Sequence, residues 1–138
     1  MSETGKQEAL ILRETDEPYA RPLARILDDL RRPLPESMLQ VRQVGGRRMR
    51  YLSTRDTIAV LDQVAPGWEG TITNLYTVRD RVVVVYRLTI HAAEGRFSRE
   101  GTGSESLDAG SQTADATLLA EGAALRNAAS MFGLGLFL

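Results

Sequence analysis

The chain has 138 residues, which corresponds to one domain with a modest hydrophobic core. It contains no cysteine and a single histidine, so disulfides, zinc–thiolate centres, cysteine nucleophiles and multi-histidine metal sites are excluded. No apolar run is long enough to span a membrane, and no basic stretch followed by an apolar one marks a signal peptide at the N-terminus. These features fit a cytoplasmic protein.

The positive charge is concentrated in one segment. Residues 31–55 contain seven arginines and one acidic residue, Glu36, although the net charge of the whole chain is −1. A localised cationic surface is typical of a protein that binds a polyanion, and nucleic acid is the commonest polyanion. Guanidinium groups also favour planar phosphate contacts and stacking on bases. The alternative is that these arginines flank a turn and are only solvated.

The chain begins with an expected arm and an expected helix. Residues 1–19 are mostly polar and acidic, and we expect a flexible or peripheral arm there. After Pro22, apolar residues recur at helical spacing, which predicts a helix over about 20–32 that Pro33 ends.

A β-hairpin is expected next. Two extended segments, 38–44 and 47–52, flank Gly45-Gly46, and a two-residue hairpin turn needs positive φ at both positions, which glycine adopts readily. The two-residue period of a strand then assigns the charged and aromatic side chains to two faces: Arg42, Arg47 and Tyr51 to one, Arg48 and Arg50 to the other.

A second helix is expected from Ser53 or Thr54, either of which can cap it, to Ala65. Three antiparallel strands are predicted after it, at 71–78, 81–91 and 96–102. The middle strand contains four consecutive valines, Val82–Val85, so we expect it at the centre of the sheet and buried on both faces.

A loop rich in Gly and Ser is expected over 101–111, and a long helix over about 112–132. The predicted order is therefore α–β–β–α–β–β–β–α, an α+β fold. In it, an antiparallel sheet, made of a hairpin plus a three-stranded meander, packs on the long C-terminal helix. We expect a single domain over 20–138.

Most of the motifs that could indicate catalysis or ligand binding lack a residue or a spacing that their chemistry requires. Gly101-Thr102-Gly103 does not lead directly into a helix and has no following Lys, so a phosphate loop is not indicated. His91 has no obvious acidic partner, and we expect a packed or surface histidine. Since no nucleophile, base, cofactor site or metal site is indicated, we do not expect an enzyme. Arg126 lies in an otherwise uncharged helix end, where it is either solvated or an anion contact.

The segments taken together resemble the Rad-fifty-two-type single-strand annealing family, which includes eukaryotic recombination mediators and bacterial and phage relatives. The similar features, in chain order, are LRRPLPESMLQVR (30–42), Gly45-Gly46, Tyr51, Gly67-Trp68, Gly101-Thr102-Gly103 and the closing ALRNAASMFGLGLFL (124–138). The resemblance covers about residues 20–138, and we expect a protein of bacterial or phage origin.

The resemblance implies a homo-oligomeric ring that binds single-stranded DNA in a groove. Such a ring anneals complementary strands without ATP, in recombination and double-strand break repair. A recombinase or a single-strand binding protein is a further partner to consider. The family's recombinase-binding tail is not expected, because the chain ends where the annealing domain of the family ends.

The resemblance also assigns site residues. The family's hairpin arginine falls on Arg42, its hairpin tyrosine on Tyr51 and its helix lysine on Arg126. A second, outer DNA site would use Arg79 or Arg81.

Two departures from the family pattern affect these assignments. Further basic positions of the family helix are Asn127 and Ser130 here, and an acidic stretch around Asp108 replaces basic residues of the outer site. We therefore expect the inner groove to depend more on the remaining arginines of the cationic segment: Arg47, Arg48, Arg50 and Arg55.

Two other functions are compatible with parts of the pattern. A β–β–β–α order also occurs in double-stranded RNA-binding modules, which would place lysines at the start of the last helix. Here that helix starts with Thr113-Ala114-Asp115, and the Asp115 carboxylate would repel phosphate. The other alternative is a small assembly domain that binds no nucleic acid.

Overall fold

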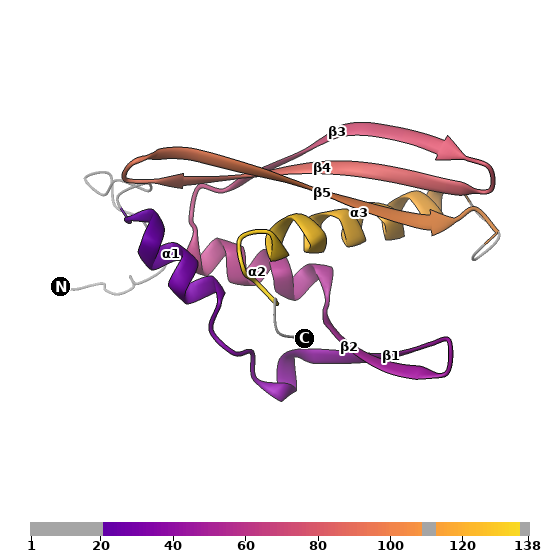
Figure 1. Ribbon diagram of the computed structural model, residues 1–138, viewed down its shortest axis with the longest axis horizontal. Coiled ribbons are helices and arrows are strands. Elements are labelled where there is room, and N and C mark those ends of the chain that lie inside the picture. Colours follow the sequence, from indigo (N-terminus) through magenta and orange to yellow (C-terminus); the bar gives the residue numbers. More distant parts are fainter. Residues whose placement is uncertain (1–20, 109–112, 136–138) are drawn as a thin grey trace.

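The structure, a computed structural model, describes residues 21–108 and 113–135. The expected arm at 1–19 lies outside the described residues. The elements in chain order are α1 (Leu23–Leu30), the short 3-10 helix η1 (Glu36–Met38), β1 (Leu39–Val44), β2 (Arg47–Leu52), α2 (Thr54–Val64), β3 (Glu69–Val78), β4 (Arg81–Ala92), β5 (Gly95–Ser106) and α3 (Thr113–Ser130). The predicted α+β fold and its element order are confirmed (Figure 1).

The strands form two separate antiparallel sheets, whereas one sheet containing both the hairpin and the meander was expected. One contains β1 and β2, and the other has the order β3-β4-β5. Helix α3 packs on β4 and β5, α2 packs on α3, and α1 packs on α2. Figure 1 shows the resulting layers, with the three-stranded sheet on one side, α3 beneath it, and the β1–β2 hairpin extending away from the helices.

Strand β4 is the centre of its sheet, as predicted, but only one of its faces is fully buried. The side chains of Val82, Val84, Leu88 and Ile90 alternate along the strand and are buried. The valines between them are half-buried, because no described element covers the outer face of the sheet. The expectation that both faces are buried is therefore wrong.

Strand β5 continues to Ser106, so the prediction of a loop from Gly101 was wrong. Gly101 and Gly103 lie where α3 approaches the strand most closely. A Cβ added to Gly101 would lie 2.2 Å from the Ala128 nitrogen, and one added to Gly103 would lie 2.4 Å from the Ala120 oxygen. The glycines therefore permit close helix–strand packing, which their composition alone does not distinguish from a loop.

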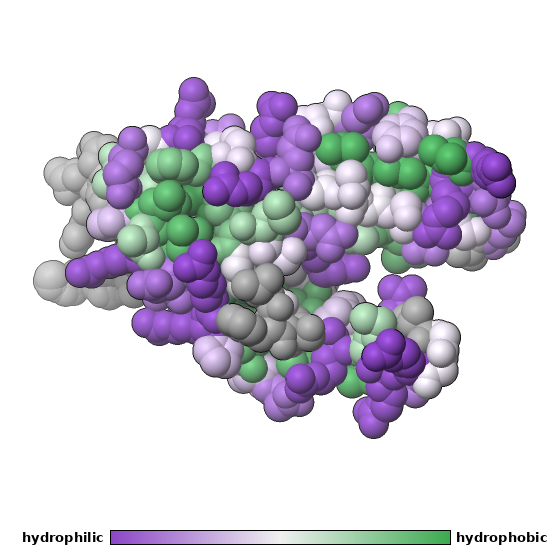
Figure 2. All heavy atoms as spheres, viewed as in Figure 1, coloured by the Kyte–Doolittle hydropathy of each residue, from purple (hydrophilic) through white to green (hydrophobic). Residues whose placement is uncertain are grey.

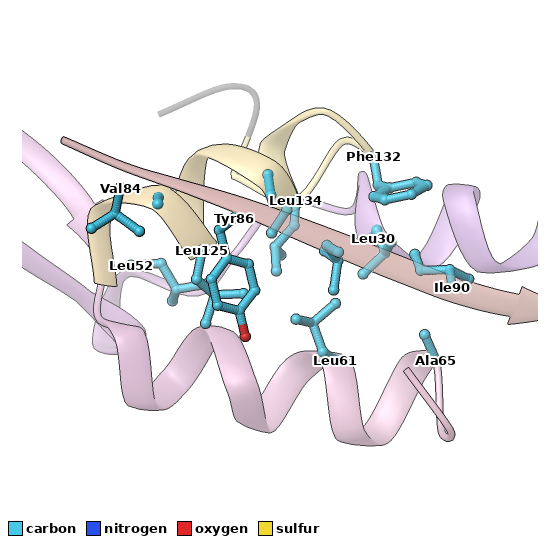
Figure 3. Packing of buried hydrophobic residues seen from close by; sticks show 14 of the residues in the cluster. Leu30, Leu52, Leu61, Ala65, Val84, Tyr86, Ile90, Leu125, Phe132 and Leu134 are labelled. Carbon is cyan, nitrogen blue, oxygen red and sulfur yellow. The ribbon is translucent and has the colours of Figure 1, made fainter. Parts of the chain in front are cut away.

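The buried face of α3 is built from small side chains. Ala116, Ala120, Ala124 and Ala128 follow one another at four-residue intervals and are fully buried against the sheet. Larger side chains fill the remaining space. Figure 3 shows side chains of the three helices and of the turn after α3 grouped with those of β4: Leu30, Leu61, Leu125 and Phe132 with Val84, Tyr86 and Ile90. In the described part of the chain, no helix has the length and apolar character needed to cross a bilayer.

His91 has an acidic partner, contrary to the expectation. Its Nε2 lies 2.5 Å from a carboxylate oxygen of Glu69, and its side chain is almost fully buried. Glu69 begins β3 and His91 lies near the end of β4, so the pair joins the two strands at one end of the sheet. The antiparallel pairing of β3 with β4 brings the two together, and the sequence prediction missed the pair because it began the first of these strands at residue 71.

Candidate nucleic-acid interface

The β1–β2 hairpin has the predicted register. Arg42 faces Met49, Gln40 faces Tyr51 and the turn is formed by Gly45 and Gly46. Both glycines have positive φ, 56° and 77°, as a two-residue turn of this kind requires. The assignment of Arg42, Arg47 and Tyr51 to one face, and of Arg48 and Arg50 to the other, follows from this register.

The hairpin extends from the rest of the molecule as a separate lobe. Every described side chain from Val41 to Arg50 is exposed, whereas Leu52 at the base of β2 is buried in the core. Figure 2 shows the lobe with strongly hydrophilic side chains, divided from the sheet and α3 by an open notch. Leu52 therefore anchors the hairpin in the core, and the charged residues of the hairpin remain available to a ligand.

The structure brings together three residues that are distant in the sequence: Arg42 on β1, Tyr51 on β2 and Arg126 on α3. We call them the Arg–Tyr cluster. The Arg126 guanidinium lies over the Tyr51 ring, with Cζ 5.5 Å from the ring centroid, which is within the range of a cation–π contact. Arg42 is near enough for its charge to act on Arg126.

The electrostatics of the cluster favour an anion. Burial lowers the pKa of Arg126, the Tyr51 hydroxyl opposes this shift, and the positive charge of Arg42 lowers the pKa further. Arginine nevertheless stays protonated, so the positive charges of Arg126 and Arg42 act on each other at this site. Among residues 21–108 and 113–135, no carboxylate forms an ion pair with Arg42 or Arg126. A phosphate bound here would therefore relieve the repulsion between the two guanidinium groups.

The other arginines of the cationic segment differ in whether an acidic residue pairs with them. Arg47, Arg48 and Arg55 are exposed, and no described acid pairs with them. Arg50 instead forms an ion pair with Glu36, the one acidic residue of the segment. An anion at Arg50 would have to compete with the Glu36 carboxylate.

A cavity of about 280 Å³ lies beside the cluster, where β2, α2 and α3 meet. Its lining includes Asn127 and Ser130, the two positions at which the family resemblance implies basic residues. Both are engaged within the protein. The Asn127 amide donates to the Thr102 carbonyl at 2.6 Å, and the Ser130 hydroxyl donates to the Asn127 carbonyl at 2.8 Å. Cationic contacts on this side of the cavity therefore come from Arg126 and Arg50 alone among the described lining residues.

Arg79 and Arg81 lie at one end of the three-stranded sheet. Arg79 is in the β3–β4 turn, where it adopts a positive φ of 56°, and Arg81 begins β4 and donates to the Ser104 hydroxyl at 3.0 Å. No hydrogen bond, ion pair or ring contact of the described residues joins them to the Arg–Tyr cluster. Any contact that they make with DNA would belong to a separate surface.

One contact of the cluster was not expected from the sequence. Arg126 donates from Nη1 to the Thr54 hydroxyl at 2.8 Å, although the two residues are 72 positions apart. Either Ser53 or Thr54 was expected to cap α2. The structure shows that Ser53 is the cap, since its hydroxyl accepts from the Asp56 nitrogen at 3.1 Å. The sequence signals this contact only through the Ser-Thr pair, because one hydroxyl suffices to cap the helix and the other can then accept a different hydrogen bond.

The fold and the site define an α+β protein with a partly buried arginine–tyrosine cluster between a hairpin and a long helix. Two relatives are similar to it over most of its length. The chain is 34% identical over 121 residues to "DNA repair RAD52-like protein 1, mitochondrial" from Arabidopsis thaliana, and 31% identical over 122 residues to "DNA repair RAD52-like protein 2, chloroplastic" from the same plant. Each match covers 86% of this chain, and 68% and 61% of the respective relative.

The chain therefore belongs to the RAD52-like family of DNA repair proteins, the family that the sequence motifs resemble. No family model matches it. The chain spans about two thirds of each relative's length. Both relatives have organellar names, so they give no support to the expectation of a cytoplasmic protein of bacterial or phage origin.

Proposed function

We propose that this chain binds single-stranded DNA on the Arg–Tyr cluster and anneals complementary strands without ATP. One observation carries the proposal. The hairpin register, the anchoring of Leu52 and the packing of α3 converge to place Arg42, Tyr51 and Arg126 in one cluster, with no described acid to neutralise it. These are the three positions to which the family resemblance assigns inner-groove contacts.

The chemistry of annealing requires no catalytic group. Arginines along a groove neutralise phosphates and release counterions, so binding is independent of base sequence and falls steeply with salt. Tyr51 adds an aromatic face on which a base or sugar can stack. When the phosphates face the protein, the bases point outward and can pair with a complementary strand. The protein therefore acts by holding the strand, and we assign no enzymatic step to it.

We further propose that the chain acts as a homo-oligomer, in a ring as the family resemblance implies, because one domain holds only a few nucleotides. Two features support association. All ten residues of the edge strand β3 are exposed, and a long open edge is a site for pairing with another chain. Large apolar side chains also remain exposed on α3 and the turn after it, with Leu118 at 66% and Met131 at 59%. Leu134 in the same turn is buried and does not add to this exposed apolar surface.

The test is a titration of fluorescein-labelled oligo-dT at increasing salt, followed by annealing of two complementary strands without nucleotide. We expect binding to single strands in preference to a blunt duplex, a steep loss of affinity with salt, and faster annealing than without protein. Salt-insensitive binding, or equal affinity for the duplex, would contradict the proposal.

The double-stranded RNA alternative finds less support. Modules of that kind place cations at the start of the helix that follows the meander. Helix α3 instead has Asp115 in its first turn, where a carboxylate complements the helix dipole and repels phosphate. The same titration with an RNA duplex distinguishes the two functions directly.

A further inference from the structure

Helix α2 and helix α3 meet at one polar contact next to the Arg–Tyr cluster. The Arg126 guanidinium makes two contacts: it donates to the Thr54 hydroxyl at 2.8 Å and it lies over the Tyr51 ring. Arginine has a long side chain with many rotamers, and ordering it costs conformational entropy. Two fixed contacts on one guanidinium already order the side chain, so less conformational entropy is lost when a ligand binds.

The approach of Thr54 to α3 depends on a residue without a side chain. A Cβ built on Gly122 would lie 2.5 Å from the Thr54 hydroxyl and 3.4 Å from Nη1 of Arg126. Real Cβ atoms are not found this close to an oxygen, so any other residue at position 122 would displace the Thr54 hydroxyl or the helix. Gly122 also lies in the middle of α3, where glycine is the least favourable residue apart from proline. Its presence there is explained by the room that Thr54 needs.

The local structure of α2 leaves the Thr54 hydroxyl available. The Ser53 hydroxyl caps the helix by accepting from the Asp56 nitrogen. The Thr57 hydroxyl donates to the Ser53 carbonyl. Thr54 is the first residue of α2 and is only half-buried, so its hydroxyl is not needed to satisfy the helix end. Its hydrogen bond with Arg126 is therefore separable from the formation of the helix.

We propose that Thr54 is a positioning residue for Arg126, and that Gly122 provides the space for it. Thr54 uses one of the five N–H donors of the guanidinium and fixes its plane over Tyr51, which leaves the other donors for a phosphate. Thr54 itself need not touch DNA. This inference rests on the proposed function, since it assigns to Thr54 the arrangement of a DNA-binding group.

The test is a set of substitutions measured by oligo-dT affinity. Thr54→Ala should weaken binding by about 3- to 10-fold, the effect of one lost hydrogen bond, and Thr54→Ser, which keeps the hydroxyl, should restore it. Thr54→Ala should have less than a twofold effect when Arg126 is already Ala. An equal loss in both backgrounds would overturn the proposal, because Thr54 would then act independently of Arg126.

Gly122→Ala is a second test, in which the expected effect on helix stability and the expected effect on DNA binding have opposite signs. Helix propensity alone predicts that alanine stabilises α3, whereas the positioning role predicts weaker DNA binding, with the loss reduced when Thr54 is also Ala. Unchanged affinity in Gly122→Ala would contradict the proposal. Loss of affinity in Arg126→Ala but not in Thr54→Ala would refute the positioning role and leave the proposed function intact.

A readout without DNA separates the two claims completely. An arginine-selective dicarbonyl reagent, followed by peptide mass spectrometry, reports how accessible the Arg126 guanidinium is. We expect faster modification of Arg126 in Thr54→Ala than in the unsubstituted protein or in Thr54→Ser. Equal rates would overturn the positioning role, whether or not the protein binds DNA. Absence of oligo-dT binding by the unsubstituted protein would instead overturn the proposed function.

Discussion

Replacing Gly103 by alanine should destabilise the protein by displacing α3 from the sheet. The new Cβ would lie 2.4 Å from both the Ala120 oxygen and the Ala124 nitrogen. These are backbone atoms of a helix, so no side chain can rotate away, and the helix would have to move by about 1 Å to restore an ordinary contact of 3.4 Å. Overpacking of a filled core costs about 1–3 kcal/mol. Because two backbone atoms clash at once, we expect a cost near 3 kcal/mol.

Thermal unfolding followed by circular dichroism measures this cost. For a domain of this size, about 3 kcal/mol corresponds to a fall in Tm of roughly 10 °C. Thr102→Ala is the matched control, because Thr102 is the exposed neighbour of Gly103 on the same strand. Its Tm should change by no more than about 2 °C. An unchanged Tm for Gly103→Ala would refute the reasoning that these glycines exist for close packing.

Three further predictions concern charge, pH and assembly. Arg126→Gln should lower the slope of log affinity for oligo-dT against log salt by about 0.7, the value for one lost phosphate contact on a single strand. The control is Arg87→Ala, which should leave the slope unchanged, because Arg87 pairs with Glu100 on the outer face of the sheet. Asp29→Asn should destabilise the protein at neutral pH, because a hydrogen bond from Arg21 holds the pKa of Asp29 below its ordinary value of 3.8. This loss should shrink in denaturant titrations as the pH falls through the lowered pKa, since the wild-type carboxylate is then protonated too, and a pH-independent loss would contradict the assignment. Light scattering should give the mass of several chains, and a strictly monomeric mass at tens of micromolar would argue against the oligomer.

The hairpin was predictable because its determinants are local. Gly45-Gly46 between two extended segments fixes the turn length, and the turn length fixes which side chains share a face. The pairing of Arg42 with Met49 followed from this count alone. The end of β5 was not predictable in the same way. Gly101 and Gly103 have the composition of a loop, and only the position of α3 shows that they are packing residues.

The site was partly predictable. Strand parity placed Arg42 and Tyr51 on one face, but parity within a hairpin says nothing of a helix 75 residues later in the chain. The position of Arg126 came from the family resemblance, and its contact with Tyr51 comes from the packing of α3 on the sheet. The ion pair of Arg50 with Glu36 depends on the path of the chain through η1. Long-range contacts of this kind leave no periodic signal in the sequence.

The measurement that tests the central claim most directly compares oligo-dT affinities of Arg42→Ala, Tyr51→Ala and Arg48→Ala with that of the unsubstituted protein. Arg42 and Tyr51 share the face of the hairpin that meets Arg126, whereas Arg48 lies on the opposite face. We expect Tyr51→Ala to cost about 1–3 kcal/mol of binding free energy and Arg42→Ala to weaken binding as well. Arg48→Ala should have a smaller effect than either. An equal loss for Arg48 and Arg42, or no loss in any of the three, would contradict the assignment of the Arg–Tyr cluster as the DNA-binding surface.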